Sequence, residues 1–156
     1  MGVGGETKNL VTQEDTQKNA HIPTDWVHAR TPNGEACLHL TGIFGHSDVT
    51  RYLLTHGADP NIRSTYSEGL RMHPLSWNVY GGHIENIELL LQHGAEVNLD
   101  FDGMAGSSEV TALDVVKQIQ SAENGDERFT KIEALLLQHG AKTYSELQQA
   151  KSKEEL

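Results

Sequence analysis

Apolar residues recur along the chain in short helical patterns, and each pattern ends at a glycine. The first pattern predicts a helix that stops at Gly45 and has an apolar face made of Leu38, Leu40 and Ile43. The next predicts a helix that ends at Gly57 and has an apolar face made of Val49, Tyr52, Leu53 and Leu54. Neither helix is long enough to be stable alone. Burial against neighbouring helices must therefore supply the stability.

This arrangement repeats along the chain. The segment LLQHGAEVN at 90–98 has near-copies in LLTHGADPN at 53–61 and LLQHGAKTY at 136–144. Upstream of the first two, a Gly-His pair occurs in register, as Gly45-His46 and Gly82-His83. Internal repeats of this length predict stacked helix pairs that bury their apolar faces against one another.

The repeated units resemble ankyrin repeats. The family's Gly-x-Thr-Pro-Leu-His start, central Gly-His and Leu-Leu-x-x-Gly-Ala-Asp-Val-Asn end are matched by GEACLHL, GH and LLTHGADPN in one unit. The next unit has HPLSW, GGH and LLQHGAEVN, and the third has TALD and LLQHGAK. The resemblance implies an all-α solenoid of stacked helix pairs, with long finger loops built on β-turns along one side and a concave recognition face.

The resemblance also divides the chain. The repeats are expected over 31–144, as units at about 31–64, 65–101 and 102–144, with both connecting fingers longer than usual. Residues 1–30 are expected to form a partly disordered segment with a degenerate capping helix. Residues 145–156 are expected to form a C-terminal capping helix or tail, starting with Ser145 as its cap.

Two sets of residues stand where the family has residues that stabilise its turns and fingers. The third unit begins with Thr111-Ala112-Leu113-Asp114, where Thr111 and Asp114 could form a capping pair. Asn61 and Asn98 occupy a position whose side chain normally braces the finger in the family. Some family asparagines at this position are hydroxylated, so hydroxylation of Asn98 is the alternative to bracing.

Composition limits the classes of partner. The formal net charge is −10, and no run of lysine or arginine provides a basic surface for nucleic acid or an anionic membrane. No apolar run approaches the length of a membrane span, and Cys37 is the single cysteine. We expect a monomer in the cytoplasm, with the nucleus as an alternative compartment.

The nine histidines raise the question of a metal site. Their spacings follow the repeat and lack the patterns that place two ligands on one helix face. Motifs for a nucleophile, a phosphate-binding loop or a metalloprotease are also missing. We therefore expect no enzyme activity and no cofactor or metal; a histidine-dependent metal protein remains as an alternative.

Binding of another protein is the predicted function. The resemblance places variable, inward-looking helix positions at Ile43, Phe44, Tyr80, Gly81, Gln118 and Ile119. Large apolar side chains at exposed positions favour a partner surface, unless the long fingers fold back over Phe44 and Tyr80 and bury them. Additional contacts are expected from the fingers, namely Arg63, Tyr66, Arg71, Met72, Phe101 and Met104. A structural subunit that self-associates through the same face is the alternative.

Overall fold

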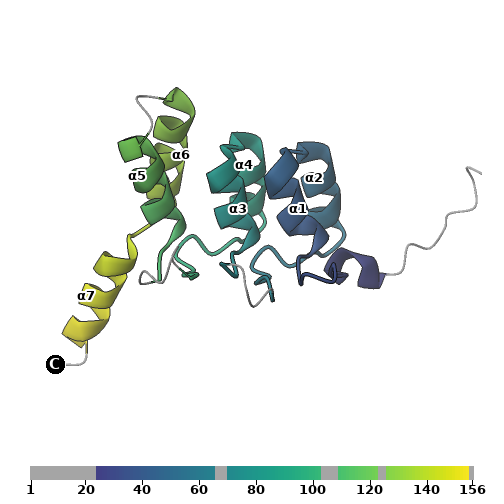
Figure 1. Cartoon of the computed structure of the whole chain (residues 1–156), viewed down its shortest axis with the longest axis horizontal. Coiled ribbons are helices and arrows are strands. Elements are labelled where there is room, and N and C mark those ends of the chain that lie inside the picture. The colour runs from purple at the N-terminus through teal and green to yellow at the C-terminus, as the bar shows by residue number, and fades with distance from the viewer. Residues whose placement is uncertain (1–23, 66–69, 103–108, 123–125, 155–156) are drawn as a thin grey trace, which may run out of the picture.

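Three helix pairs stand side by side in the computed structural model, which describes residues 24–65, 70–102, 109–122 and 126–154 (Figure 1). A short 3-10 helix, η1 (Thr24–His28), precedes the stack. The pairs are α1 (Cys37–Phe44) with α2 (Ser47–Thr55), α3 (Pro74–Gly81) with α4 (Ile84–Gln92), and α5 (Ala112–Ala122) with α6 (Glu127–Gln138). A last helix, α7 (Tyr144–Glu154), follows them. The predicted all-α stack of helix pairs is confirmed.

Glycines end the helices at the predicted places. Gly45 and Gly82 adopt left-handed backbone conformations, with φ of 74° and 73°, at the ends of α1 and α3. The Gly45 N–H donates to the carbonyl of Thr41 at 2.8 Å, which satisfies a carbonyl of the last helical turn. A side chain at this φ would be strained, so glycine allows the sharp turn into the second helix of each pair.

Leucines between the pairs form one continuous core. The first helices contribute Leu38, Leu75 and Leu113, and the second helices contribute Leu53, Leu90 and Leu136; all six are buried. Burial of each such side chain contributes about 1.5–3 kcal/mol. This inter-pair burial compensates for the marginal stability of helices with only 8 to 12 residues.

The fingers bury two residues that we expected to contact a partner. Phe101 is 1% exposed and Met72 is 3% exposed, and both belong to the core. Backbone pairing draws the finger strands together, because Ser64 N–H donates to Met72 O at 3.1 Å and Phe101 pairs with Val110. The extra finger length thus lets apolar side chains reach the core. The assignment of Met72 and Phe101 as exposed contacts was wrong.

Different hydrogen bonds stabilise the first turn of the first unit and that of the third. His39 accepts a hydrogen bond from Ala36 N–H at its Nδ1 (2.9 Å), and its Nε2 donates to Ile62 O (3.0 Å). In the third unit, the N–H and hydroxyl of Thr111 both donate to Asp114 Oδ2 at 2.9 Å. The predicted Thr111–Asp114 capping pair is therefore confirmed.

Buried asparagines join α1, α3 and α4. Asn78 donates to Pro74 O at 2.9 Å, and its own side-chain oxygen accepts from Asn86 Nδ2 at 2.8 Å. The same Asn86 nitrogen lies 3.2 Å from Thr41 O on the preceding repeat. Because each buried amide needs partners, this network favours one alignment of the first two repeats.

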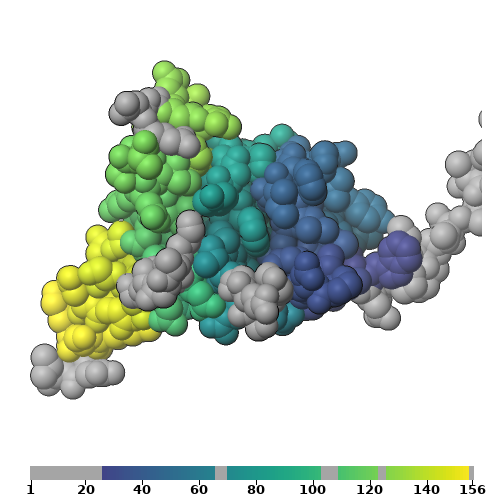
Figure 2. Space-filling model, viewed as in Figure 1, coloured from purple at the N-terminus to yellow at the C-terminus, as the bar shows by residue number. Residues whose placement is uncertain are grey.

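The C-terminal helix begins earlier than expected and is differently placed. Thr143 forms the cap, since its N–H donates to Glu146 Oε2 at 2.7 Å and its hydroxyl accepts from Glu146 N–H at 3.3 Å. The prediction of Ser145 as cap was wrong. Helix α7 has no buried residue and stands out from the end of the stack (Figures 1 and 2). Leu137 is consequently 51% exposed, although Leu54, at the equivalent position, is 6% exposed.

Glycine at position 42 allows α1 and α3 to pack closely. A Cβ atom at Gly42 would lie 2.7 Å from the Cβ of Trp77 and 3.0 Å from the backbone nitrogen of Asn78. On α3, the equivalent position is Val79, which is fully buried. Helices α3 and α5 are packed less closely than α1 and α3. The close approach at Gly42 thus has no counterpart at Val79, where the equivalent position carries a side chain.

Replacement of Gly42 by alanine tests this packing. Alanine ordinarily stabilises a helix interior by about 0.5–1 kcal/mol relative to glycine. Here we expect Gly42→Ala to lower the free energy of unfolding by about 1–3 kcal/mol, because the added methyl group overlaps α3. Chemical denaturation measures the change. A stabilised Gly42→Ala protein would show that α1 and α3 are not in this close contact.

The buried histidines should make stability depend on pH. Burial lowers the pKa of His39 and His73 below the ordinary 6.5, and for His39 this outweighs the opposing effect of Glu35. Because the unfolded chain binds protons more readily than the folded chain, the free energy of unfolding is highest above about pH 6.5. It decreases as the pH falls below that value. We expect the melting temperature to decrease from pH 7.5 to pH 5.5.

A pair of glutamine variants separates the buried histidine from an exposed one. His39→Gln should be less stable at pH 7.5 and should lose part of the pH dependence, because the titrating group is removed. His93→Gln, at the exposed end of α4, should retain the wild-type pH profile. Equal profiles for wild type and His39→Gln would contradict the assignment of His39.

Candidate protein-binding face

Large side chains stand exposed at the ends of the first helices of the pairs. Phe44 is 67% exposed, Tyr80 is 56% exposed and Ile43 is 47% exposed. The described parts of the fingers therefore do not bury Phe44 and Tyr80, although the sequence had left that alternative open. We refer to Ile43, Phe44, Tyr80, Gln118 and Ile119 together as the inner row.

Position in the repeat explains how the inner row forms. Ile43, Tyr80 and Gln118 are equivalent residues of α1, α3 and α5, and Phe44 and Ile119 are equivalent on either side of Gly81. A Cβ at Gly81 would lie 2.6 Å from the carbonyl oxygen of Gly42, so this position cannot hold a side chain without movement. The row is therefore interrupted at Gly81 between two apolar residues.

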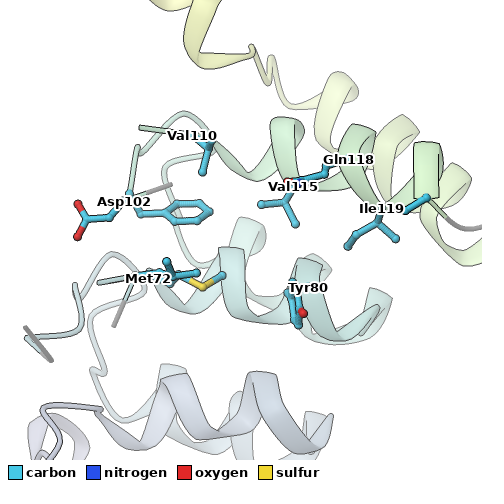
Figure 3. Close-up of a pocket in the computed structure, with 10 residues that line it drawn as sticks. Met72, Tyr80, Asp102, Val110, Val115, Gln118 and Ile119 are labelled. Carbon is cyan, nitrogen blue, oxygen red and sulfur yellow. The ribbon is translucent and has the colours of Figure 1, made fainter. Parts of the chain in front are cut away.

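A pocket of about 350 Å³ lies beside the inner row, between the second and third helix pairs. Figure 3 shows Met72 and Tyr80 on one side and Val110, Val115 and Ile119 on the other. Phe101 also lines it. Met72 and Phe101 thus contribute to the candidate face only as buried lining residues of this pocket.

Arginines join the fingers at the mouth of the pocket. Arg71 donates two hydrogen bonds to Asp102, from Nε at 2.5 Å and from Nη2 at 2.6 Å. This pairing lowers the pKa of the Asp102 carboxyl and raises the pKa of the Arg71 guanidinium. Arg63 donates to the carbonyls of Arg71 and Asp100, each at 3.1 Å. Both arginines thus hold the fingers together, while their side chains stay 36% and 46% exposed.

Arg71 has an unusual backbone conformation. Its φ of 48° lies in the left-handed region, which costs a non-glycine residue about 1–2 kcal/mol. The bidentate pair with Asp102 and the Arg63 bond to the Arg71 carbonyl help to hold it there. Two other predicted finger contacts, Tyr66 and Met104, lie outside the described residues.

Asn61 and Asn98 brace the fingers against the following repeat. Asn98 Nδ2 donates to Gly140 O at 3.1 Å, and its Oδ1 accepts from Lys142 N–H at 2.7 Å. Asn61 makes the equivalent bonds, to Gly94 O at 3.2 Å and from Glu96 N–H at 2.8 Å. The predicted bracing role is confirmed for both side chains.

The histidines at the helix ends have structural partners. His56 Nδ1 lies 2.7 Å from Tyr52 O, and His139 Nδ1 lies 2.9 Å from Leu135 O, each within its own helix. Within the described part of the chain, no group of three or more His, Cys, Asp or Glu side chains is arranged to hold a metal ion. His56 and His139 thus bond to the last turns of their own helices.

Comparison with known families identifies the repeats. Residues 8–101 match the family model described as ankyrin repeats in three copies. The chain belongs to the ankyrin-repeat family. Ankyrin repeats are typically non-catalytic and bind proteins. The match starts within residues that the structure does not describe and ends before α5, so it does not include the third helix pair.

Curated relatives match part of this ankyrin-repeat chain, which spans less than a fifth of their length. It is 34% identical over 87 residues to the NF-kappa-B inhibitor cactus of Drosophila yakuba, and equally so to that of Drosophila melanogaster. This region is 56% of the chain and 17% of each cactus protein. The chain is also 35% identical over 95 residues to human ankyrin repeat and MYND domain-containing protein 1. These 95 residues are 60% of this chain and 9% of the human protein.

Among the residues that the structure describes, none forms a helix with the length and apolar character needed to cross a membrane.

Loss of the Asn98 amide tests the bracing. Asn98→Ala removes both hydrogen bonds and leaves Gly140 O and Lys142 N–H to find other partners. We expect about 1–2 kcal/mol lower stability in urea denaturation. Gln92→Ala, at an exposed site on α4, should change stability by less than about 0.5 kcal/mol. Equal stability of the two variants would contradict a bracing role.

Proposed function

We propose that this chain is a non-catalytic protein-binding module that holds a partner protein against the inner row and the neighbouring fingers. The observation that carries the proposal is the exposure of Ile43 and Tyr80 at equivalent positions of adjacent repeats, together with the exposed Phe44 next to Ile43. Of these side chains, Tyr80 also lines the apolar pocket between α3 and α5.

The physical basis is burial of apolar side chains on association. Isolated exposed apolar residues are normal, but a group of them beside a pocket is typical of a binding surface. Aromatic side chains at the centre of an interface often supply most of the binding free energy. Phe44 and Tyr80 are suited to this role, and the finger arginines can contribute at the rim.

Preorganisation supports the same proposal. The row stands on helices whose spacing depends on the Asn78–Asn86 network and on leucine burial. Arg63, Arg71 and Asp102 hold the fingers through hydrogen bonds within the chain. A partner would therefore meet a surface that loses little conformational freedom on binding.

The relatives agree with a binding role. Cactus is named as an inhibitor of NF-kappa-B and is 34% identical to this ankyrin-repeat chain over 87 residues. For this chain we propose protein binding as the shared property; the consequence for the partner depends on which of its surfaces is covered.

Truncation of the inner row tests the proposed function. The wild-type chain is used to capture its partner, and the partner is then purified. Calorimetry measures the dissociation constant of the complex between the partner and each form of the chain. The double variant Phe44→Ala/Tyr80→Ala should bind at least about tenfold more weakly, because two apolar anchors are removed. Its melting temperature should stay near that of wild type, since both side chains are exposed.

A control on the opposite helices completes the test. Val49→Ala changes an exposed residue of α2 and should bind the partner as wild type does. Unchanged binding by Phe44→Ala/Tyr80→Ala would contradict the proposal. Capture of nothing but further copies of this chain, confirmed by sedimentation velocity, would instead favour self-association through this face.

A further inference from the structure

The pocket lies at the junction of the second and third helix pairs. Gly42 lets α1 approach α3, and at the equivalent position α3 carries a buried valine, Val79. The wider α3–α5 spacing leaves the volume of about 350 Å³ beside Tyr80 and Ile119. This volume lies at the lower end of the range for pockets that bind small molecules.

The lining specifies an apolar occupant. Phe101 and Met72 lie at the finger side, and Val115 and Ile119 belong to α5. Tyr80 closes the α3 side with an aromatic ring that is 56% exposed. A single large side chain, aromatic or long aliphatic, would replace water against all of these surfaces.

Polar groups lie at the edges of the pocket. Gln118 presents a side-chain amide and Tyr80 a hydroxyl, and both residues are exposed. Such groups can bond to the backbone of an extended segment whose side chain enters the pocket. The edge is therefore suited to a peptide chain that continues on either side of the anchor.

Asp102 gives the finger edge a preference for positive charge. Its carboxylate accepts two hydrogen bonds from Arg71, and carboxylate oxygens offer about four acceptor positions in all. Asp100 and Glu109 lie on the same finger, so three carboxylates stand beside the two arginines Arg63 and Arg71. The whole chain carries a formal net charge of −10, which adds to the attraction of a basic segment.

We propose that the pocket between α3 and α5 holds one large apolar side chain of an extended partner segment, and that a lysine or arginine next to this anchor pairs with Asp102. The inference rests on the proposed function, because it names the part of the partner that this face selects. It adds a specificity pocket at the junction of the second and third repeats, lined by Tyr80, Phe101 and Ile119.

A library of random peptides displayed on phage, selected on the full chain, tests the proposal. Enriched peptides should share a large apolar residue with lysine or arginine within two positions of it. One selected peptide is then synthesised, together with versions that carry alanine at the anchor, or alanine or glutamate at the basic position. Fluorescence anisotropy measures their dissociation constants.

Blocking variants connect the peptide to the pocket. Ile119→Trp places an indole ring in the cavity, and Gln118→Trp covers the cavity from an exposed position. Each variant should bind the peptide at least tenfold more weakly than wild type. Val49→Trp adds the same bulk on α2 and should bind as wild type does. Circular dichroism checks that each variant is folded.

Charge pairing is measured with Asp102→Asn. On wild-type chain, the peptide with glutamate at the basic position should bind more weakly than the alanine version, and the basic peptide should bind best. On Asp102→Asn, the advantage of the basic peptide should shrink, because the proposed pair has been removed.

Several results would overturn the proposal. They are an absence of enriched peptides, enrichment without a large apolar residue, a preference for acidic neighbours, or equal affinity for wild type and both blocking variants. The proposed function is tested separately by Phe44→Ala/Tyr80→Ala and the natural partner. If that double variant loses the partner while Ile119→Trp retains it, the pocket assignment alone fails.

Discussion

Burial of leucines between neighbouring helix pairs is the interaction on which the rest of this structure depends. Each helix is too short to be stable alone, and the leucines on both helices of a pair are buried only because another pair lies against them. Exposure of Leu137 on the last pair shows the same dependence, since α7 does not cover that face. The shape of the stack is therefore set by whatever controls the distance between pairs.

The junctions between repeats differ at equivalent positions. The absence of a side chain at Gly42 lets α1 and α3 pack closely, and at the equivalent position α3 carries a buried valine, Val79. Buried asparagines link the first two repeats, and a pocket lined by Tyr80 lies between the second and third. A repeat protein can thus build a single specific site from nearly identical units.

Sequence patterns were sufficient to predict the structural features that recur from repeat to repeat. Gly45 and Gly57 marked helix ends, Thr111 and Asp114 formed the expected cap, and Asn98 made the expected bonds. These are local effects of backbone conformation and hydrogen bonding, which a short motif encodes. Exposure of Phe44 also followed from its place in the repeat.

Features that depend on long-range packing could not be predicted in the same way. Met72 and Phe101 lie in fingers longer than the family usually has, and only the folded path shows that they reach the core. The cap at Thr143 was missed because Ser145 is an equally suitable residue nearby. The pocket had one signal in the sequence, the replacement of Gly42 by Val79 between aligned repeats, but its meaning depends on the geometry of α3 and α5.

The crystal structure of the chain bound to its partner tests the central claim most directly, because it shows which surface is covered. The account predicts that Phe44 and Tyr80 are buried by the partner and that a large apolar side chain lies between Tyr80 and Ile119. A partner bound to the outer helices α2, α4 and α6, with the inner row and the pocket still open to solvent, would contradict it.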